Sequence, residues 1–538
     1  MQQIVSLNER RNALAFWLGC AIVTAGVVLH LPMFLMGRNT GYVLAGMPMG
    51  TDMLWGMALI VFGIVLTGYG LLPRVPPGTE RVVETIAPPE DAPLTRAHWF
   101  IASLLGLALI IDIMKPASLG FVTPGMRREY GVDKAMVAWL PLAALTGTVI
   151  GSFIWGALAD LYGRRASILL SSVMFIGTSI CGAMPGFWWN VFMCLLMGMA
   201  AGGMLPVTYA LLAEVMPTRH RGWMLVLVGG IGAVGGFFAA SSLSALLQPE
   251  FGWRIMWFLN MPTGLILIAL SPLLPESARF LQQMGRGAEA RAVLARFGAV
   301  LQTAAPAREG GGFQTRSARV TTTPQAEDRP HLPPADRGSL KLTVALTFGA
   351  LAWGLVNFGL MLWLPSALVA EGRSVAVASA LIAQSTLISA PVILVSTWLY
   401  AAWSTKGALV VMIVVMTLGL AGLLVRGAGI SGLELIENPV VPLTLLIVGS
   451  CGVIAILLPY TAESYPLRVR GRATGWIAGC SKFGGLIAQG LSVAGFVPPL
   501  GTAALIIAVP TVLSLALISL FGHESRGRDL RELEASAT

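Results

Sequence analysis

Residues 156–165 read Gly-Ala-Leu-Ala-Asp-Leu-Tyr-Gly-Arg-Arg and separate two apolar runs, at about 136–158 and 167–185. The glycines permit a tight turn, because glycine adopts backbone conformations that other residues avoid. The acid and the arginines lie where a membrane surface would meet water, so they can pair across helices or with a helix dipole. The stretch therefore predicts a short turn between two membrane-spanning helices.

The composition of the whole chain supports this interpretation. Of its 538 residues, 56% are hydrophobic and only 11% are charged, whereas a soluble globular protein has about 25% charged residues. So few charges cannot cover so much apolar surface in water, which excludes a soluble enzyme, a nucleic-acid binder and a disordered scaffold. The net charge of +9 resides in short loops between apolar runs, a pattern typical of membrane orientation and not of nucleic-acid binding.

Apolar runs long enough to cross a bilayer as helices, about 20 residues each, recur along the chain. There are fourteen, at about 13–36, 53–72, 99–123, 136–158, 167–185, 189–213, 223–247, 254–274, 341–364, 375–400, 407–426, 439–462, 473–495 and 499–521. Transmembrane strands would instead alternate over about 10 residues, and the sequence has no such segments. We therefore predict an all-α membrane protein.

The 35 Lys and Arg residues predict its orientation. With both termini in the cytoplasm, Lys115 and Lys482 fall within spans and only seven others fall outside the cell: Arg38, Arg127, Arg128, Lys134, Arg254, Arg373 and Arg426. Cytoplasmic loops carry an excess of Lys and Arg, so this orientation is preferred. The preference for Arg over Lys indicates a bacterial genome, and hence the inner membrane.

Residues 275–340 interrupt the apolar pattern with a long polar segment. Residues 275–298 have the loose apolar face of a helix, and residues 303–338 have the composition of a flexible linker. Six spans precede this segment and six follow it, once the first two spans are set apart. The expected domains are an extra helix pair and linker (1–96), an N-terminal six-helix bundle (97–275), a cytoplasmic helix and flexible linker (276–340), a C-terminal six-helix bundle (341–523) and a cytoplasmic tail (524–538).

The two halves repeat a short motif. Residues 214–222 read Glu-Val-Met-Pro-Thr-Arg-His-Arg-Gly at the end of the sixth span, and residues 463–471 read Glu-Ser-Tyr-Pro-Leu-Arg-Val-Arg-Gly at the end of the twelfth. An acid, a proline and an Arg-Gly pair at equivalent places indicate an internal repeat, as in many transporters.

With these motifs the chain resembles the major facilitator superfamily over roughly residues 97–523. The stretch 156–165 is similar to that family's loop between its second and third core helices. Residues 252–254 (Gly-Trp-Arg) and 275–281 (Pro-Glu-Ser-Ala-Arg-Phe-Leu) resemble the sugar-porter, organic-ion and metabolite:proton symporter branches. The resemblance implies two six-helix bundles around a central cavity that opens alternately to either side of the membrane.

The sequence departs from the family pattern in three places. The second copy of the Gly-Asp-Arg loop, expected near residues 396–408, has lost its acid. Cys194 occupies the position at which many relatives carry an arginine within the fourth core helix. The glycines of residues 229–236 match the antiporter signature only in part, and we interpret them as close helix packing.

Ionisable groups within the spans are the strongest candidates for chemistry, because a charge at mid-bilayer costs roughly 2.5–3.5 kcal/mol and is usually functional. Asp112 and Lys115 share one helix face at i and i+3, next to Pro116. We predict that Asp112 carries the proton, with Lys115 as its local partner in place of the missing arginine. A static ion pair is the alternative.

Lys482 lies deep in the thirteenth span, and in this family the corresponding helix often lines the cavity. We expect it to bind a carboxylate, although a lysine that reaches water at the helix end is the alternative. Weaker candidates for substrate binding are Trp353, Asn357, Gln384 and Tyr460. The sugar porters' Gln-Gln and Asn pattern is absent from residues 349–365, which disfavours hexoses.

The resemblance also implies a cytoplasmic gate. Asp160 and Arg164 would latch the two bundles together, and Glu214, Arg221, Glu463 and Arg470 would form a second ring. The predicted gate comprises Gly156, Asp160, Gly163, Arg164, Arg165, Glu214, Arg221, Glu463 and Arg470.

The sequence implies no cofactor: it has no phosphate-binding Gly-x-x-x-x-Gly-Lys motif, and its five histidines lack metal-ligand spacing. We predict a secondary transporter that couples uptake of a small organic acid to protons. The alternatives are a proton antiporter that exports drugs or metabolites, and a membrane sensor that does not transport. Whether the first two helices bind a partner, mediate dimers or brace one bundle stays open.

Overall fold

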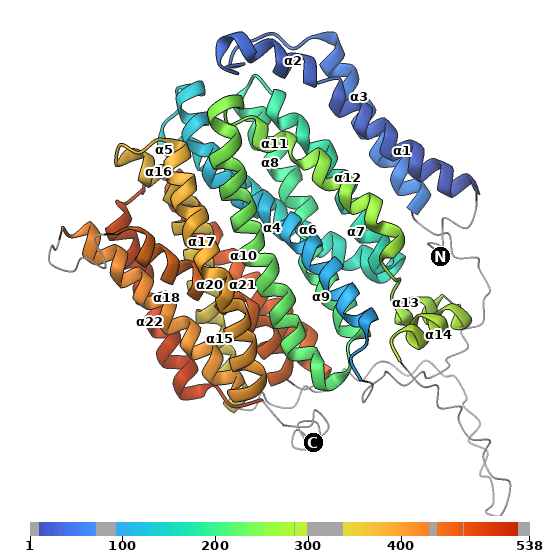
Figure 1. Cartoon of the computed structure of the whole chain (residues 1–538), viewed down its shortest axis with the longest axis vertical. Coiled ribbons are helices and arrows are strands. Elements are labelled where there is room, and N and C mark those ends of the chain that lie inside the picture. Colours follow the sequence, from blue (N-terminus) through green and yellow to red (C-terminus); the bar gives the residue numbers. More distant parts are fainter. Residues whose placement is uncertain are drawn as a thin grey trace, which may run out of the picture.

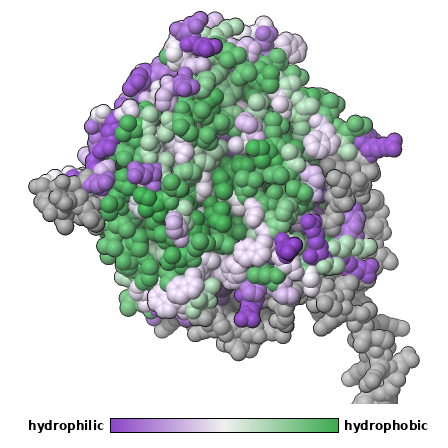
Figure 2. All heavy atoms as spheres, viewed as in Figure 1, coloured by the Kyte–Doolittle hydropathy of each residue, from purple (hydrophilic) through white to green (hydrophobic). Residues whose placement is uncertain are grey.

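The computed structural model describes residues 10–71, 93–284, 286–298, 337–429, 438–465 and 467–525, and all the regular structure in these ranges is helical. Thirteen of the helices are long and apolar enough to cross a membrane. The fourteenth expected span corresponds to α21 (Leu467–Val493), which is 27 residues long but is not among the thirteen. Apolar side chains cover most of the middle of the face shown in Figure 2, and polar ones gather towards its ends.

The core helices form two groups that lie side by side (Figure 1). The N-terminal group comprises α4 (Arg96–Tyr130), α5 (Lys134–Val137), α6 (Trp139–Tyr162), α7 (Arg164–Gly177), α8 (Phe187–Ala201), α9 (Met204–Val215), α10 (Thr218–Phe251), α11 (Ile255–Phe258) and α12 (Asn260–Leu270). The C-terminal group comprises α15 (Arg337–Gly354), α16 (Met361–Ala370), α17 (Val375–Trp398), α18 (Thr405–Gly427), α20 (Val440–Ser464), α21 and α22 (Leu500–Phe521). Two π-helical turns, η5 (Leu355–Leu360) and η6 (Leu399–Trp403), adjoin α15 and α17.

Glycines let the long helix α10 pack closely against α4. A Cβ placed on Gly232 would lie 2.6 Å from Leu109, and one on Gly236 would lie 2.7 Å from Ile113. The glycine run 229–236 therefore serves helix packing here, as we interpreted it, since small residues allow two backbones to approach.

The segment after α12 contains two short helices instead of the single helix expected over residues 275–298. The Ser277 side chain accepts a hydrogen bond from the Phe280 N–H and so caps α13 (Ala278–Gln283). The second helix, α14 (Gly287–Arg296), begins after a break. The expected linker 303–338 lies almost entirely outside the described residues. In Figure 1, α13 and α14 lie at the lower end of the molecule, and α5 and α16 lie at the opposite, upper end.

The two extra helices form a hairpin on the N-terminal bundle. α1 (Arg10–Val28) and α3 (Thr51–Leu71) pack against each other and against α7, beside the rest of the molecule in Figure 1. Between them, α2 (Leu31–Met36) and the turn η2 (Gly37–Thr40) bring Phe34 against Phe258, with ring centroids 4.9 Å apart. The hairpin is thus seated on core helices of the N-terminal half.

One buried carboxylate ties this hairpin to the core. Glu129, at the upper end of α4, accepts hydrogen bonds from the backbone N–H groups of Leu44 (2.7 Å) and Ala45 (3.0 Å). It also pairs with Arg254 at 2.6 Å, where the two side chains are only 4% and 0% exposed, and accepts a bond from the Trp253 indole at 2.7 Å. A single side chain therefore joins the hairpin loop, α4 and the segment before α11.

Replacing this carboxylate should destabilise the protein. We expect Glu129→Gln to lower the free energy of unfolding by about 3–5 kcal/mol, because it leaves the buried Arg254 without a counter-charge. Thermal unfolding of the purified protein measures this loss. Glu250→Gln, which changes an exposed acid on α10, is the matched control and should stay within about 0.5 kcal/mol of the parent. Equal unfolding temperatures for the two variants would contradict the assignment.

Candidate functional site

Three ionisable side chains lie near one another at mid-height, two on α4 and one on α21 of the other bundle. Asp112 on α4 interacts electrostatically with Lys115, one turn further along the same helix, and with Lys482 on α21 of the other bundle. Asp112 is 5% exposed, and its Oδ1 atom has no hydrogen-bond partner in the described ranges of the chain. The structure thus brings together all three groups that the sequence marked for chemistry.

Lys115 does not form the expected contact ion pair with Asp112. Its side chain is 1% exposed, and its Nζ atom has no hydrogen-bond partner among the described residues. The ammonium lies over the ring of Phe175 on α7, 3.0 Å from the ring centroid. An aromatic face attracts a cation through its quadrupole. The Phe175 ring, within the N-terminal bundle, therefore stabilises the Lys115 ammonium in place of an ion pair with Asp112.

Lys482 lies over an aromatic ring in the same manner. Its Nζ atom is 4.5 Å from the centroid of Phe358, which belongs to the π-helical turn η5. Lys482 is half-buried, so its amine is more open than that of Lys115. Asn357, the preceding residue of the same turn, is also half-buried, and its side-chain amide has no hydrogen bond within the described part of the chain. Its amide is therefore available to a ligand.

Trp353 stands behind this group. Its indole Nε1 donates a hydrogen bond to the Ser450 carbonyl at 2.8 Å, which fastens α15 to α20. Its ring meets Phe358 edge to face, with centroids 5.5 Å apart. Trp353 therefore supports the ring that lies beneath Lys482.

The remaining two candidates lie elsewhere. Gln384 is exposed on the face of α17 that also carries the exposed side chains of Leu387 and Ile388. The Tyr460 hydroxyl donates to the His523 carbonyl at 2.7 Å and accepts from the His523 N–H at 3.1 Å, so it joins α20 to the segment after α22. The structure does not bring either residue to the charged group.

The Gly-Asp-Arg loop forms a network within the N-terminal bundle at the lower end. Glu276 accepts hydrogen bonds on Oε1 from the backbone N–H groups of Arg164 (2.9 Å) and Arg165 (3.3 Å). Gly163 has φ +101°, and a Cβ there would lie 2.6 Å from the Glu276 carboxylate, so this turn requires glycine. Glu214 pairs with Arg164 at 3.3 Å and accepts a bond from the Ser277 hydroxyl.

A second network in the C-terminal bundle has the same arrangement of a glutamate, a backbone N–H group and a serine hydroxyl. We did not predict it from the sequence. Glu524 accepts a bond from the Thr405 backbone N–H at 2.9 Å, as Glu276 does from Arg164. The Ser525 hydroxyl donates to Glu463 at 3.0 Å, as that of Ser277 does to Glu214. The signal was present in the sequence, because a Glu-Ser pair follows the last helix of each half, at 276–277 and 524–525.

Arg164 forms several contacts at the lower end. Among its partners are Glu214, the Glu276 carboxylate and the Ala159 carbonyl. The latch between Asp160 and Arg164 across the two bundles stays a prediction. One contact between the bundles lies where α10 begins: a Cβ on Gly222 would overlap Glu463, whose carboxylate also accepts a hydrogen bond from the Tyr400 hydroxyl at 2.6 Å.

The other predicted gate residues contribute less to this contact. Arg221 reaches the Met216 carbonyl at 3.4 Å. Gly156 is half-buried with no neighbour near its Cα hydrogens. The side chains of Asp160 and Arg470 lie outside the described residues, so their roles stay predictions.

Glu276 should make stability depend on pH. Burial raises the pKa of its carboxyl above the usual value, although the N–H groups that it accepts and nearby Arg165 act in the opposite direction. Because the folded-state pKa is the higher one, the folded state binds more protons than the unfolded chain. This contribution therefore stabilises below the ordinary glutamate pKa of about 4.3 and is lost as the pH rises through the folded-state value.

We expect Glu276→Gln to flatten the pH dependence of the unfolding temperature in that window. Its amide oxygen can still accept the three N–H bonds that reach Oε1, so the variant removes the titrating group while the backbone contacts of the turn can persist. Unfolding scans at a series of pH values measure the slope, with Asp52→Asn, an exposed acid, as control. A slope as steep as that of the parent would refute this role.

Comparison with known proteins agrees with this architecture. Residues 99–489 match the Major Facilitator Superfamily. The niacin transporter NiaP from Acinetobacter baylyi is 24% identical over 82% of this chain and 98% of its own length. A gallate transporter from Pseudomonas putida is 28% identical over 77% of this chain and 88% of its own length.

A solved structure has the same fold. The partially occluded inward open conformation of the xylose transporter XylE from E. coli superimposes with a TM-score of 0.60 at 15% identity, over 81% of this chain and 100% of that one. The match to the family covers most of the chain and both halves of the molecule. The chain therefore belongs to the Major Facilitator Superfamily, and it is a multi-pass membrane transporter of small molecules and not an enzyme.

Proposed function

We propose that this transporter takes up a small organic acid together with protons by alternating access. The observation that carries the proposal is a buried carboxylate on one bundle, Asp112, whose Oδ1 has no hydrogen-bond partner among the described residues. The ammonium of Lys482 on the other bundle lies 4.5 Å from the centroid of the Phe358 ring and is close enough to Asp112 for their charges to interact. A carboxylate at this position competes with an incoming organic anion for the same ammonium group. The names of the relatives, transporters of niacin and gallate, support an aromatic acid as the substrate.

The proposed topology follows from the charges. We place both termini and the lower end in the cytoplasm of a bacterium, count α21 as the fourteenth span, and keep the domain limits 1–96, 97–275, 276–340, 341–523 and 524–538. α21 is more polar than the other spans because it carries Lys482, Gln489 and several small polar residues. A polar helix is tolerated where it faces a bundle interior or a cavity.

Asp112 acts in this proposal as the proton carrier. While it is ionised, it holds the ammonium of Lys482 by charge. Protonation removes that charge, so Lys482 becomes available to the substrate carboxylate. Lys115, over Phe175 and inaccessible to solvent, keeps a second positive charge close to Asp112 and favours release of the proton once the substrate has left.

The substrate body would lie against the aromatic group beside Lys482. Phe358 presents its ring there, Trp353 supports that ring, and the free amide of Asn357 offers a donor and an acceptor. An aromatic acid can place its carboxylate on Lys482 and its ring on Phe358 at the same time. The proposed gate comprises the two lower-end networks, and we propose that Asp160 and Arg470 act with them.

Proton coupling should depend on Asp112. We expect Asp112→Asn to abolish accumulation of labelled nicotinate, 4-hydroxybenzoate or gallate driven by a pH gradient in proteoliposomes, because the amide cannot carry a proton. Exchange of substrate across the membrane, which needs no net proton movement, should persist. Ser118→Ala on the same helix is the control.

Gradient-driven accumulation that survives in Asp112→Asn would refute the proton carrier. The direction of proton flux in the parent protein separates uptake from the alternative of export: protons that move with the substrate indicate symport, and protons that move against it indicate an antiporter.

Carboxylate recognition should depend on Lys482. We expect Lys482→Gln to weaken binding of nicotinate about tenfold or more, the effect of losing one hydrogen bond to a charged group, while binding of uncharged nicotinamide changes little. Equilibrium binding to the purified protein measures both. Arg472→Gln removes an exposed charge from the same helix and should leave both affinities unchanged. Equal losses for the acid and the amide would argue against a carboxylate contact.

A further inference from the structure

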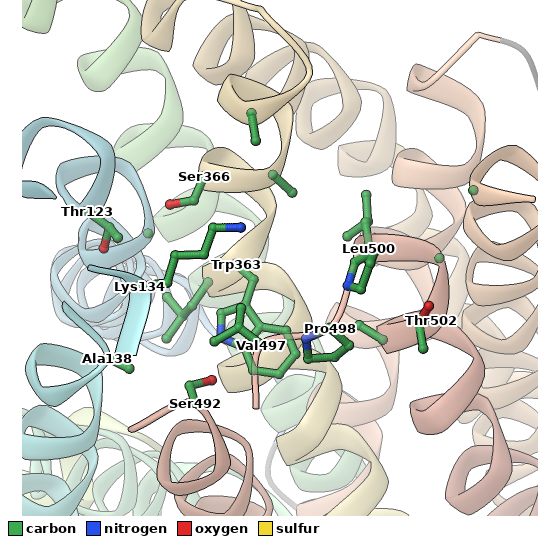
Figure 3. A pocket seen from close by; sticks show the side chains of 18 of the residues that line it. Thr123, Lys134, Ala138, Trp363, Ser366, Ser492, Val497, Pro498, Leu500 and Thr502 are labelled. Atoms are coloured by element: carbon green, nitrogen blue, oxygen red, sulfur yellow. The ribbon is translucent and has the colours of Figure 1, made fainter. Parts of the chain in front are cut away.

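A cavity lies at the upper end, between the two bundles. It has a volume of about 600 Å³, within the range of small-molecule sites. α4, α5 and α6 of the N-terminal bundle line it, as do α16, α21 and the start of α22 of the C-terminal bundle. We call it the upper cavity, and Figure 3 shows it from close by.

The upper cavity is separate from the charged group at mid-height. Leu119 and Gln489, which line it, each lie seven residues beyond Asp112 and Lys482 along their helices, or about 10 Å. Its floor joins the bundles: a Cβ on Gly120 would lie 3.1 Å from the Leu362 carbonyl. The side-chain Nε2 of Gln489 also donates a hydrogen bond to the backbone carbonyl of Phe358. The ring of the same Phe358 lies beneath Lys482.

Three polar atoms in the wall of this cavity are buried without a hydrogen-bond partner among the residues that the structure describes: Arg127 Nε, Ser366 Oγ and Gln489 Oε1. Buried polar atoms are usually satisfied, so such a group needs a reason. Here Arg127 Nε and Ser366 Oγ offer hydrogen-bond donors from two sides of the cavity, and Gln489 Oε1 offers an acceptor. A ligand that carries an acceptor group and a separate donor group would satisfy them.

The charges of the cavity indicate an anion. Arg127 and Lys134 have no acidic partner within the described part of the chain. The acid in the wall, Glu371, is already paired with Arg426 at 2.8 Å. Figure 3 shows Lys134 reaching from the α5 side towards α16, which carries Ser366 and Trp363. Most of the other lining residues are apolar, among them Val137, Leu362, Val497, Pro498 and Leu500.

We propose that the upper cavity is a second binding site, which takes an aromatic carboxylate bearing a ring hydroxyl. The carboxylate would lie at Arg127 and Lys134, the ring on Trp363 and the apolar wall, and the hydroxyl on Gln489 Oε1. The proposal rests on the proposed function for the direction of passage: the cavity would hold the acid on the outer side of the floor formed by Gly120 and Leu362.

Equilibrium dialysis of the full chain in lipid nanodiscs tests this site with labelled 4-hydroxybenzoate up to about 10 mM, since a site of this kind can be as weak as about 1 mM. We expect two sites in the parent protein. Lys482→Gln should lose the mid-height site, and the double variant Arg127→Gln/Lys134→Gln should weaken the upper site about tenfold or more. Arg128→Gln, which removes an exposed charge next to Arg127 and outside the cavity, should keep both.

The ligand provides a second measurement that needs no variant. Benzoate lacks the hydroxyl donor and 4-hydroxybenzamide lacks the carboxylate, so both should bind the upper site more weakly than 4-hydroxybenzoate. Trp363→Leu should weaken all three aromatic ligands without affecting the mid-height site.

The outcomes distinguish the two proposals. Binding that Lys482→Gln abolishes entirely, or that the Arg127/Lys134 double variant leaves unchanged, overturns the upper site and leaves the proposed function intact. Binding that depends on Arg127 and Lys134 but not on Lys482 supports the upper site and overturns the assignment of Lys482. A parent protein that binds none of these acids overturns both.

Discussion

The structure depends on the free-energy cost of placing a charge in hydrocarbon. Lipid cannot hydrogen-bond an ionised side chain, so every charge away from the two ends must be turned inward. Asp112, Lys115 and Lys482 meet this constraint by facing the interior of the protein, and both lysines rest on aromatic rings. The same constraint places the other polar networks at the ends of the helices.

The lower-end networks show why the two halves can differ in sequence and keep one plan. Glu276 and Glu524 bind backbone N–H groups at the start of α7 and α18. Every residue but proline has such a group, so the contact survives when the side chains around it change. The loop near residues 396–408 can therefore lack the acid and the arginines of the Gly-Asp-Arg loop and still form this contact. The Ser404 and Thr405 hydroxyls also donate hydrogen bonds to Glu524 there.

The sequence was sufficient to predict most of the fold, because spans of about 20 apolar residues admit one structure in a bilayer. Mid-membrane charge also marked Asp112 and Lys482 before any contact was known. The partner of Lys115 could not be foreseen, since Phe175 is one apolar residue among many in its span. Trp353 and Tyr460 bond to backbone carbonyls within the C-terminal half, a role that no spacing reveals. The upper cavity draws on residues from 119 to 505, which only the folded chain brings together.

Because the hairpin is attached through Glu129, the N-terminal bundle and the hairpin together occupy more membrane area than the C-terminal bundle. The hairpin packs on α7 and bonds to the end of α4, so it is attached to the N-terminal half and raises the number of candidate spans in that half from six to eight. A larger body displaces more lipid when it tilts and meets more viscous resistance. In any rocking motion the lighter C-terminal bundle would thus sweep the greater angle, and Lys482 would move past a comparatively stationary Asp112.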